Sequence, residues 1–171
     1  MKSSVGWKRL KLGVVVIHMN KFDNHKINYL VGNKSIKKII LEQPFRIFSE
    51  KIINFFIKIS EDIMKHKDIN LYPDLASFAF FCREKNLSNL KKEHTEHISK
   101  RCGRGVALHF TPSNVPMNFA YSLLFSLISG NVTLIRIGKN NYPQVLTLLK
   151  LINKRLNTNK FKLIKKKNYY F

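Results

Sequence analysis

The chain has 171 residues, of which 44% are hydrophobic, and a formal net charge of +21. This length and composition suit one globular domain with a sizeable core, and no run of about 18 apolar residues predicts a membrane span. The two cysteines, Cys82 and Cys102, supply neither a disulfide framework nor a metal-binding spacing, and we expect a cytoplasmic protein.

The basic excess is the least ordinary feature of the composition. Such a charge favours attraction to polyanions such as nucleic acid or an acidic membrane surface. The lysines are nevertheless spread along the chain, and the dense cluster at 160–167 is an exception. A solvated basic surface and a binding patch both fit this pattern, and we favour the first.

The N-terminal part predicts two short strands followed by a helix. Gly13–Ile17 is a short apolar run, and Lys26–Val31 alternates loosely before the turn residues Gly32-Asn33. Ser35 is typical of a helix cap and precedes the apolar stretch Ile36–Leu41.

Three further helices are predicted before residue 103. Ser49 with Glu50 begins the first, and its apolar residues recur at helical spacing, at Ile52, Phe56, Ile59 and Ile63. Pro73 begins a second helix, rich in Phe and Ala, that runs to about Lys85. Ser88 is predicted to cap a third, more polar helix that continues to Lys100.

Residues 106–137 predict a βαβ unit. Val106–Phe110 is an apolar run typical of a buried parallel strand, and two prolines interrupt the chain in residues 111–116. Asn118–Ile128 predicts an apolar helix that stops at Gly130-Asn131, and Val132–Ile137 predicts the second strand. Ligands bind at the loop that leaves the first strand of such units. A last helix is predicted at Gln144–Leu156.

Several segments resemble one enzyme family. The segments are TPSNVPMNFAYSLLFSLISGN followed by LIRI, INYLVGN at 27–33, YPDLASFAFFCREKNLSNLKKE at 72–93, and GRGVALHFTPSNVP at 103–116. Over about residues 27–144 the chain resembles the fatty acyl-CoA reductases of the LuxC type, which are distant relatives of the aldehyde dehydrogenases. The stretch PSNVP-x-NFAYS is far more specific than an isolated glycine-rich loop.

The resemblance implies an α/β fold, a partial aldehyde dehydrogenase-like, Rossmann-type parallel sheet preceded by a helical N-terminal region. We divide the chain into a mixed, mainly helical region at 1–102, a partial dinucleotide-binding βαβ region at 103–160 and a basic tail at 161–171. The implied reaction is NADPH-dependent reduction of a long-chain fatty acyl thioester to an aldehyde through a cysteine thioester. The resemblance places that cysteine in a later part of the enzyme, outside this sequence.

Asn114 is the catalytic candidate. The resemblance implies that its amide donates to the oxyanion formed during thioester reduction, a role that suits a fixed amide donor. An asparagine that bonds its own backbone in a turn is the alternative from the residues alone. The resemblance also places Thr111, Pro112 and Ser113 along the nicotinamide half of NADP. Simple loop geometry is the alternative for all three, and for Pro112 we favour it.

Two basic residues complete the candidate cofactor site. Arg136 ends the second strand, where the resemblance places a basic residue that reaches the adenosine ribose, and its planar fork suits a 2′-phosphate. An exposed strand-end arginine is the alternative. The family has a small hydroxyl residue after this strand, whereas this chain reads Gly138-Lys139-Asn140, and Lys139 is our replacement candidate for the phosphate contact. No metal site is predicted, because two histidines, His94 and His97, lack a third ligand.

The parallel strands are too few for a complete dinucleotide-binding domain. We therefore interpret the chain as the N-terminal part of a reductase, or the product of a truncated or frame-shifted gene, and expect little activity from it alone. The implied partners are fatty acyl-CoA or acyl-protein thioesters, the acyltransferase and synthetase subunits of a fatty acid reductase complex, and further copies of a full-length chain, with no nucleic acid. The alternatives are a non-enzymatic basic module that binds nucleic acid or an acidic surface, and an inert gene product.

Overall fold

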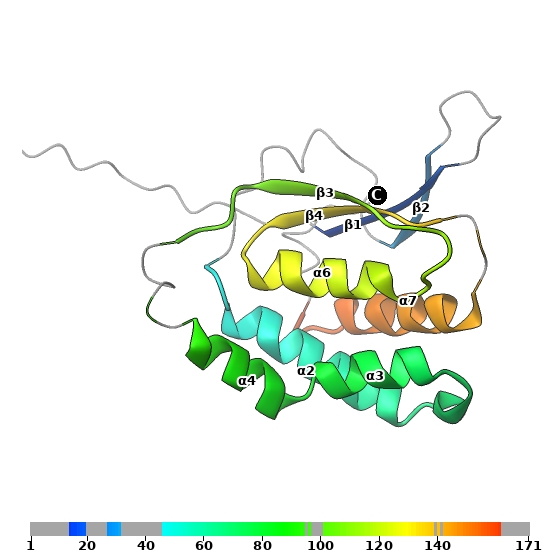
Figure 1. Ribbon diagram of the computed structural model, residues 1–171, viewed down its shortest axis with the longest axis horizontal. Helices are drawn as coiled ribbons and strands as arrows, with labels where there is room; N and C mark the ends of the chain where they lie inside the picture. The colour runs from blue at the N-terminus through cyan, green and yellow to red at the C-terminus, as the bar shows by residue number, and fades with distance from the viewer. Residues whose placement is uncertain are drawn as a thin grey trace, which may run out of the picture.

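The computed structural model describes residues 14–19, 27–31, 46–94, 96, 101–138, 140 and 142–161. Figure 1 shows three layers, with a β-sheet above two helices and a further group of helices below them. The middle layer is α6 (Asn118–Ile128) and α7 (Pro143–Leu156), and the outer layer is α2 (Glu50–Met64), α3 (Pro73–Phe81) and α4 (Glu84–Glu93).

Within the described residues, the sheet has four strands in the order β2-β1-β4-β3. They are β1 (Val14–Met19), β2 (Ile27–Val31), β3 (Val106–Phe110) and β4 (Val132–Arg136). β1 and β3 run parallel to β4, whereas β2 is antiparallel to β1. The sheet is therefore mixed, whereas the sequence predicted a parallel sheet. The α/β class and the βαβ unit β3-α6-β4 are confirmed, and the aldehyde dehydrogenase relationship of the fold stays a prediction.

The βαβ unit is held in position by two glycines, Gly103 and Gly130, and by a buried hydrogen bond between two hydroxyl groups. α6 ends where Gly130 adopts a φ of 81°, a left-handed conformation that glycine tolerates without strain. A side chain at Gly103 would place its Cβ 2.3 Å from the carbonyl oxygen of Gly130, so the backbones meet closely there. The Thr133 hydroxyl donates to the Ser126 hydroxyl at 2.8 Å, which joins β4 to α6 inside the core.

The sheet has one covered and one open face among the described residues. Alternate side chains of a strand point to opposite faces, and the Thr133–Ser126 bond places Thr133 on the face that α6 covers. Val106, Leu108 and Phe110 lie on the other face and are 41%, 50% and 67% exposed. The prediction of a buried strand at 106–110 is therefore wrong for this face, because no described helix covers it and β3 lies at the edge of the sheet.

The helices predicted within the described residues are confirmed, but α3 and α4 have other boundaries than predicted, and α4 ends at Glu93 where the sequence predicted a helix to Lys100. α2 buries Ile52, Phe56, Ile59 and Ile63, as the spacing predicted. The chain turns at Cys82-Arg83, so α3 ends earlier than predicted and α4 begins at Glu84. Ser88 is therefore inside α4 and does not cap it, because Arg83, in an extended conformation, occupies the cap position. The helix predicted at 36–41 lies outside the described residues.

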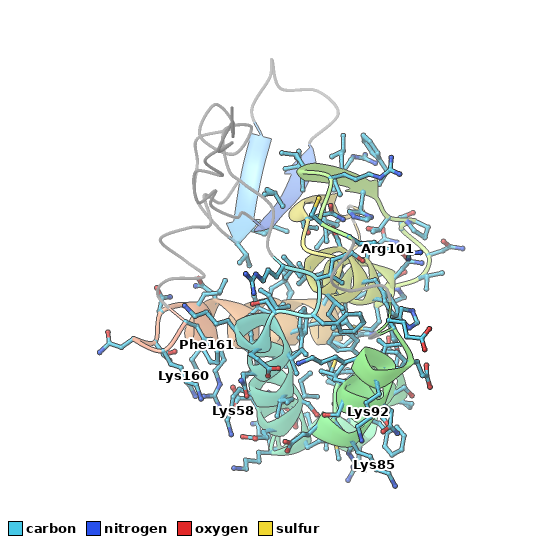
Figure 2. All side chains as sticks on the ribbon, turned by 90° about the vertical axis from the view of Figure 1, so that its left-hand side faces the viewer. Lys58, Lys85, Lys92, Arg101, Lys160 and Phe161 are labelled. Atoms are coloured by element: carbon cyan, nitrogen blue, oxygen red, sulfur yellow. The ribbon has the colours of Figure 1, made fainter. Side chains whose placement is uncertain are left out.

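Two contacts fix α7 on α2. Arg155 forms a bidentate ion pair with Asp62, in which Nε and Nη2 donate to the two carboxylate oxygens, and both side chains are largely buried. The Asp62 hydrogen bond raises the pKa of Arg155. Phe161, the first residue of the predicted basic tail, is buried with its ring edge-on to Phe55 at 5.4 Å, and Figure 2 shows it beside α2. Among the described residues, no helix is long and apolar enough to span a bilayer.

Candidate functional site

The loop that leaves β3 carries the catalytic candidate. Thr111 is buried at the strand end, and the chain then comes to the surface from Pro112 to Val115 before α6 begins. Asn114 is exposed, and its side-chain amide has no hydrogen-bond partner among the described residues. The alternative of an amide that bonds its own backbone turn thus finds no support in this part of the chain.

The loop after β4 holds the loop after β3 in place. The Thr111 amide and hydroxyl both donate to the carbonyl oxygen of Arg136, at 3.1 and 3.0 Å. Asn140 donates from Nδ2 to the Ser113 carbonyl at 3.1 Å and to the Tyr142 hydroxyl at 3.2 Å. The two loops form one surface at the carboxyl ends of β3 and β4, which we call the carboxyl edge.

Gly138 makes the closest approach between these loops. A Cβ at this position would lie 2.6 Å from the Ser113 Cβ and 2.7 Å from the Ser113 Cα, closer than real side chains come. Only glycine lets the second loop pass so near to the residue before Asn114. The position of Asn114 therefore depends on Gly138 and Asn140, which belong to a different loop.

Arg136 lies at the same edge. It is the last residue of β4 and pairs in register with Phe110, so strand alternation places its side chain on the open face of the sheet. Arg136 is half-buried, and the described residues give its guanidinium no ion pair. Thr111, Ser113, Asn114 and Arg136 thus come together, whereas Lys139 lies outside the described residues.

His109 is a half-buried histidine on β3, two residues before Thr111. It pairs with Ile135 in register, and its Nε2 atom is buried without a hydrogen-bond partner among the described residues. Burial lowers the pKa of His109, because a charged ring would lose its hydration there. The lowered pKa of His109 favours the neutral form of its ring.

Neither cysteine lies at the carboxyl edge. Cys82 is buried in the helical layers, and burial raises the pKa of its thiol. Cys102 is exposed but precedes β3, so it lies by the amino ends of the parallel strands, away from Asn114. No three His, Cys, Asp or Glu side chains gather as a metal site within the searched, described part of the chain.

The comparison with protein families identifies the chain. The family model Acyl-CoA reductase (LuxC) matches residues 37–163, which is most of the sequence. The chain belongs to the LuxC acyl-CoA reductase family. Neither the curated proteins nor the solved structures give a match.

Membership in the LuxC family gives the carboxyl edge its chemical context. The family description supports an oxidoreductase that acts on acyl-CoA, as the sequence predicted. The match does not favour a basic binding module, and in Figure 2 the labelled basic side chains stand on several different elements: Lys58, Lys85, Lys92, Arg101 and Lys160. The match also includes the first three residues of the predicted basic tail.

Sequence reasoning missed two residues that shape the carboxyl edge. In the sequence, Gly138 and Asn140 stand only as a departure from the family pattern, and Lys139 between them is the candidate for the phosphate contact. The structure gives Gly138 and Asn140 the contacts to Ser113. A glycine and an asparagine directly after a strand were the available signal, since both residues favour tight turns.

Proposed function

We propose that this chain supplies the oxyanion donor and part of the cofactor site of an NADPH-dependent acyl-CoA reductase. The overall reaction converts a long-chain acyl-CoA, NADPH and a proton into the aldehyde, free coenzyme A and NADP⁺. The amide of Asn114 carries this proposal, because it is exposed at the carboxyl edge of parallel strands and has no hydrogen-bond partner among the described residues.

Asn114 acts on the thioester carbonyl. As a nucleophile adds to this carbonyl, negative charge develops on its oxygen, and an amide N–H already in place stabilises that charge without reorganisation. Gly138 and Asn140 hold the preceding residue, Ser113, so the amide presents a fixed direction to the substrate.

The nucleophilic thiol comes from a part of the reductase outside this sequence. Cys82 is buried, and Cys102 lies by the opposite ends of the parallel strands, so neither sulfur can reach a carbonyl beside Asn114. We therefore expect the chain alone to show no acyl-CoA-dependent oxidation of NADPH. The cytoplasmic location stays a prediction.

The carboxyl edge suits NADPH. Bound NADPH supplies the hydride that reduces the acyl group. Arg136 would meet the 2′-phosphate, since its guanidinium is unpaired among the described residues and matches phosphate geometry. The loop 111–113 would lie along the nicotinamide half. Replacing Arg136 by Gln should therefore raise KM for NADPH about tenfold and leave KM for NADH unchanged.

The test combines this chain with the cysteine-bearing part of a family reductase. Asn114→Ala should lower kcat for acyl-CoA-dependent NADPH oxidation by about 10²–10³-fold, as deletion of an oxyanion donor does elsewhere. The matched control is Asn89→Ala, an exposed asparagine on α4, which should leave kcat unchanged. Equal rates for the parent and the Asn114→Ala variant would refute the role of the amide.

A further inference from the structure

Two adjoining hollows lie at the end of the molecule opposite to Asn114. The first is a cavity of about 160 Å³ with largely apolar walls from Ile47, Phe48, Leu90, His94, Phe125 and Ile128. The second, of about 460 Å³, is lined by Cys102, Gly103, Arg104 and Asn131. Both hollows share Ile47, Arg101 and Ser129, so they form one continuous space with an apolar and a polar part.

The apolar part can hold a small hydrocarbon group. A cavity of about 150 Å³ lined by Leu, Ile and Phe binds benzene in another protein, so this cavity is large enough for about six carbons. Phe48 and Ile128 form buried walls, and Phe125 is 44% exposed at the open side. Covering Phe125 with a hydrocarbon group would remove apolar surface from water, which favours binding.

The polar part presents two guanidinium groups. Arg101 and Arg104 line it without an accompanying carboxylate, and neither takes part in an ion pair within the described residues. Guanidinium groups bind carboxylates and phosphates through paired hydrogen bonds. Figure 2 looks onto this end of the molecule and labels Arg101 above α4.

The segment that carries these arginines is held rigidly. Cys102 forms a β-bridge with Arg46, and the Arg104 amide donates to Asn131 Oδ1 at 2.7 Å. Gly103 packs so closely on Gly130 that a Cβ would collide with its carbonyl group. A ligand would therefore meet a site that is already formed, at a lower cost in conformational entropy.

From this arrangement, we propose that the two hollows bind a small amphiphilic oxyanion, with an apolar group of about six carbons in the first and a carboxylate or phosphate at Arg101 and Arg104 in the second. This site is separate from the carboxyl edge and does not depend on the proposed reductase chemistry.

The experiment uses the 171-residue chain with four probes: hexanoate, hexyl phosphate, hexan-1-ol and acetate. Exposed Cys102 serves as the reporter, since its reaction with a thiol reagent should slow when the second hollow fills, while buried Cys82 stays unreactive. We expect protection with Kd near 1 mM, an affinity that ligands of this size reach. Hexanoate carries a carboxylate and hexyl phosphate carries a phosphate, so the probe that protects Cys102 with the lower Kd identifies the preferred oxyanion.

Hexan-1-ol lacks the charged head group and should give at least tenfold weaker protection, since a hydrogen bond to a charged group is worth about that factor. Acetate lacks most of the apolar group and should also give at least tenfold weaker protection, since each buried CH₂ contributes about fourfold in affinity. Equal protection by hexan-1-ol would overturn the role of the arginines, and equal protection by acetate would overturn the role of the apolar cavity. Absence of protection by both hexanoate and hexyl phosphate would refute the site.

Two variants test the same proposal independently. Arg101→Gln should weaken hexanoate binding about tenfold, whereas the control Lys92→Gln, which removes an exposed charge of the same sign on α4, should leave it unchanged. Ser129→Trp should block the junction of the hollows and abolish binding, and because Ser129 is exposed, this variant should fold. Equal losses for Arg101→Gln and Lys92→Gln would show general charge attraction and overturn the proposal.

Discussion

Replacing Gly138 with alanine tests whether one loop positions the other. The new Cβ would start 2.6 Å from the Ser113 Cβ, and ordinary contact begins at 3.4 Å, so Ser113 must move by roughly 0.8 Å. Overpacking costs about 1–3 kcal/mol. We expect about 1 kcal/mol, because Ser113 lies on an exposed loop that can shift without disturbing the core.

The functional loss should exceed the loss of stability. A misplacement of about 1 Å near a reacting centre can lower the rate about 10²-fold, and Asn114 directly follows Ser113. Urea unfolding of the chain would measure stability, and acyl-CoA-dependent NADPH oxidation by the assembled reductase would measure kcat.

Gly105→Ala is the matched control for Gly138→Ala. Gly105 has a φ of 108° with open space around its Cα, so alanine there strains the backbone by about 1–2 kcal/mol. Gly105 directly precedes β3, at the end of the strand opposite to Asn114. The substitution should lower stability to a similar extent and leave kcat unchanged. Similar kcat values for the two variants would refute the reasoning that Gly138 positions Asn114.

Three further substitutions test the packing of Leu148, the ion pair between Asp62 and Arg155, and the burial of the His109 ring. Leu148→Ala should lower the free energy of unfolding in urea by about 2–5 kcal/mol, because Leu148 is fully buried on α7; a loss well under 1 kcal/mol would contradict that packing. Asp62→Asn should cost about 1–3 kcal/mol by weakening the charged bonds to Arg155, and an unchanged urea midpoint would show that the ion pair contributes nothing. The lowered pKa of His109 means that the unfolded chain binds a proton more tightly than the folded one, so stability falls as the pH drops below about 6.5. His109→Leu should flatten that fall in a series of urea titrations, and an unaltered pH dependence would contradict the burial of this ring.

The βαβ unit was predictable almost residue by residue. Val106–Phe110 and Asn118–Ile128 match the observed strand and helix, because two prolines and Gly130 mark where each element must stop. The boundary between α3 and α4 was missed, because Ser88 has the chemistry of a cap and only tertiary packing decides that the chain turns at Cys82-Arg83.

The site was predictable only in part. A loop motif points to Asn114, but the contact of Gly138 with Ser113 joins residues from two loops and depends on the strand register. The apolar cavity joins Ile47, Leu90 and Phe125, which lie far apart in the sequence and meet only after the helices have packed. No local pattern carries such information.

Titration of the isotope-labelled chain with NADP⁺, followed by amide chemical shifts, tests the central claim most directly. The carboxyl edge should respond, with shifts at Thr111, Ser113, Asn114 and Arg136, and the amides of Arg101 and Cys102 at the opposite end should stay unchanged. Absence of binding, or shifts confined to Arg101 and Cys102, would contradict a cofactor site beside Asn114.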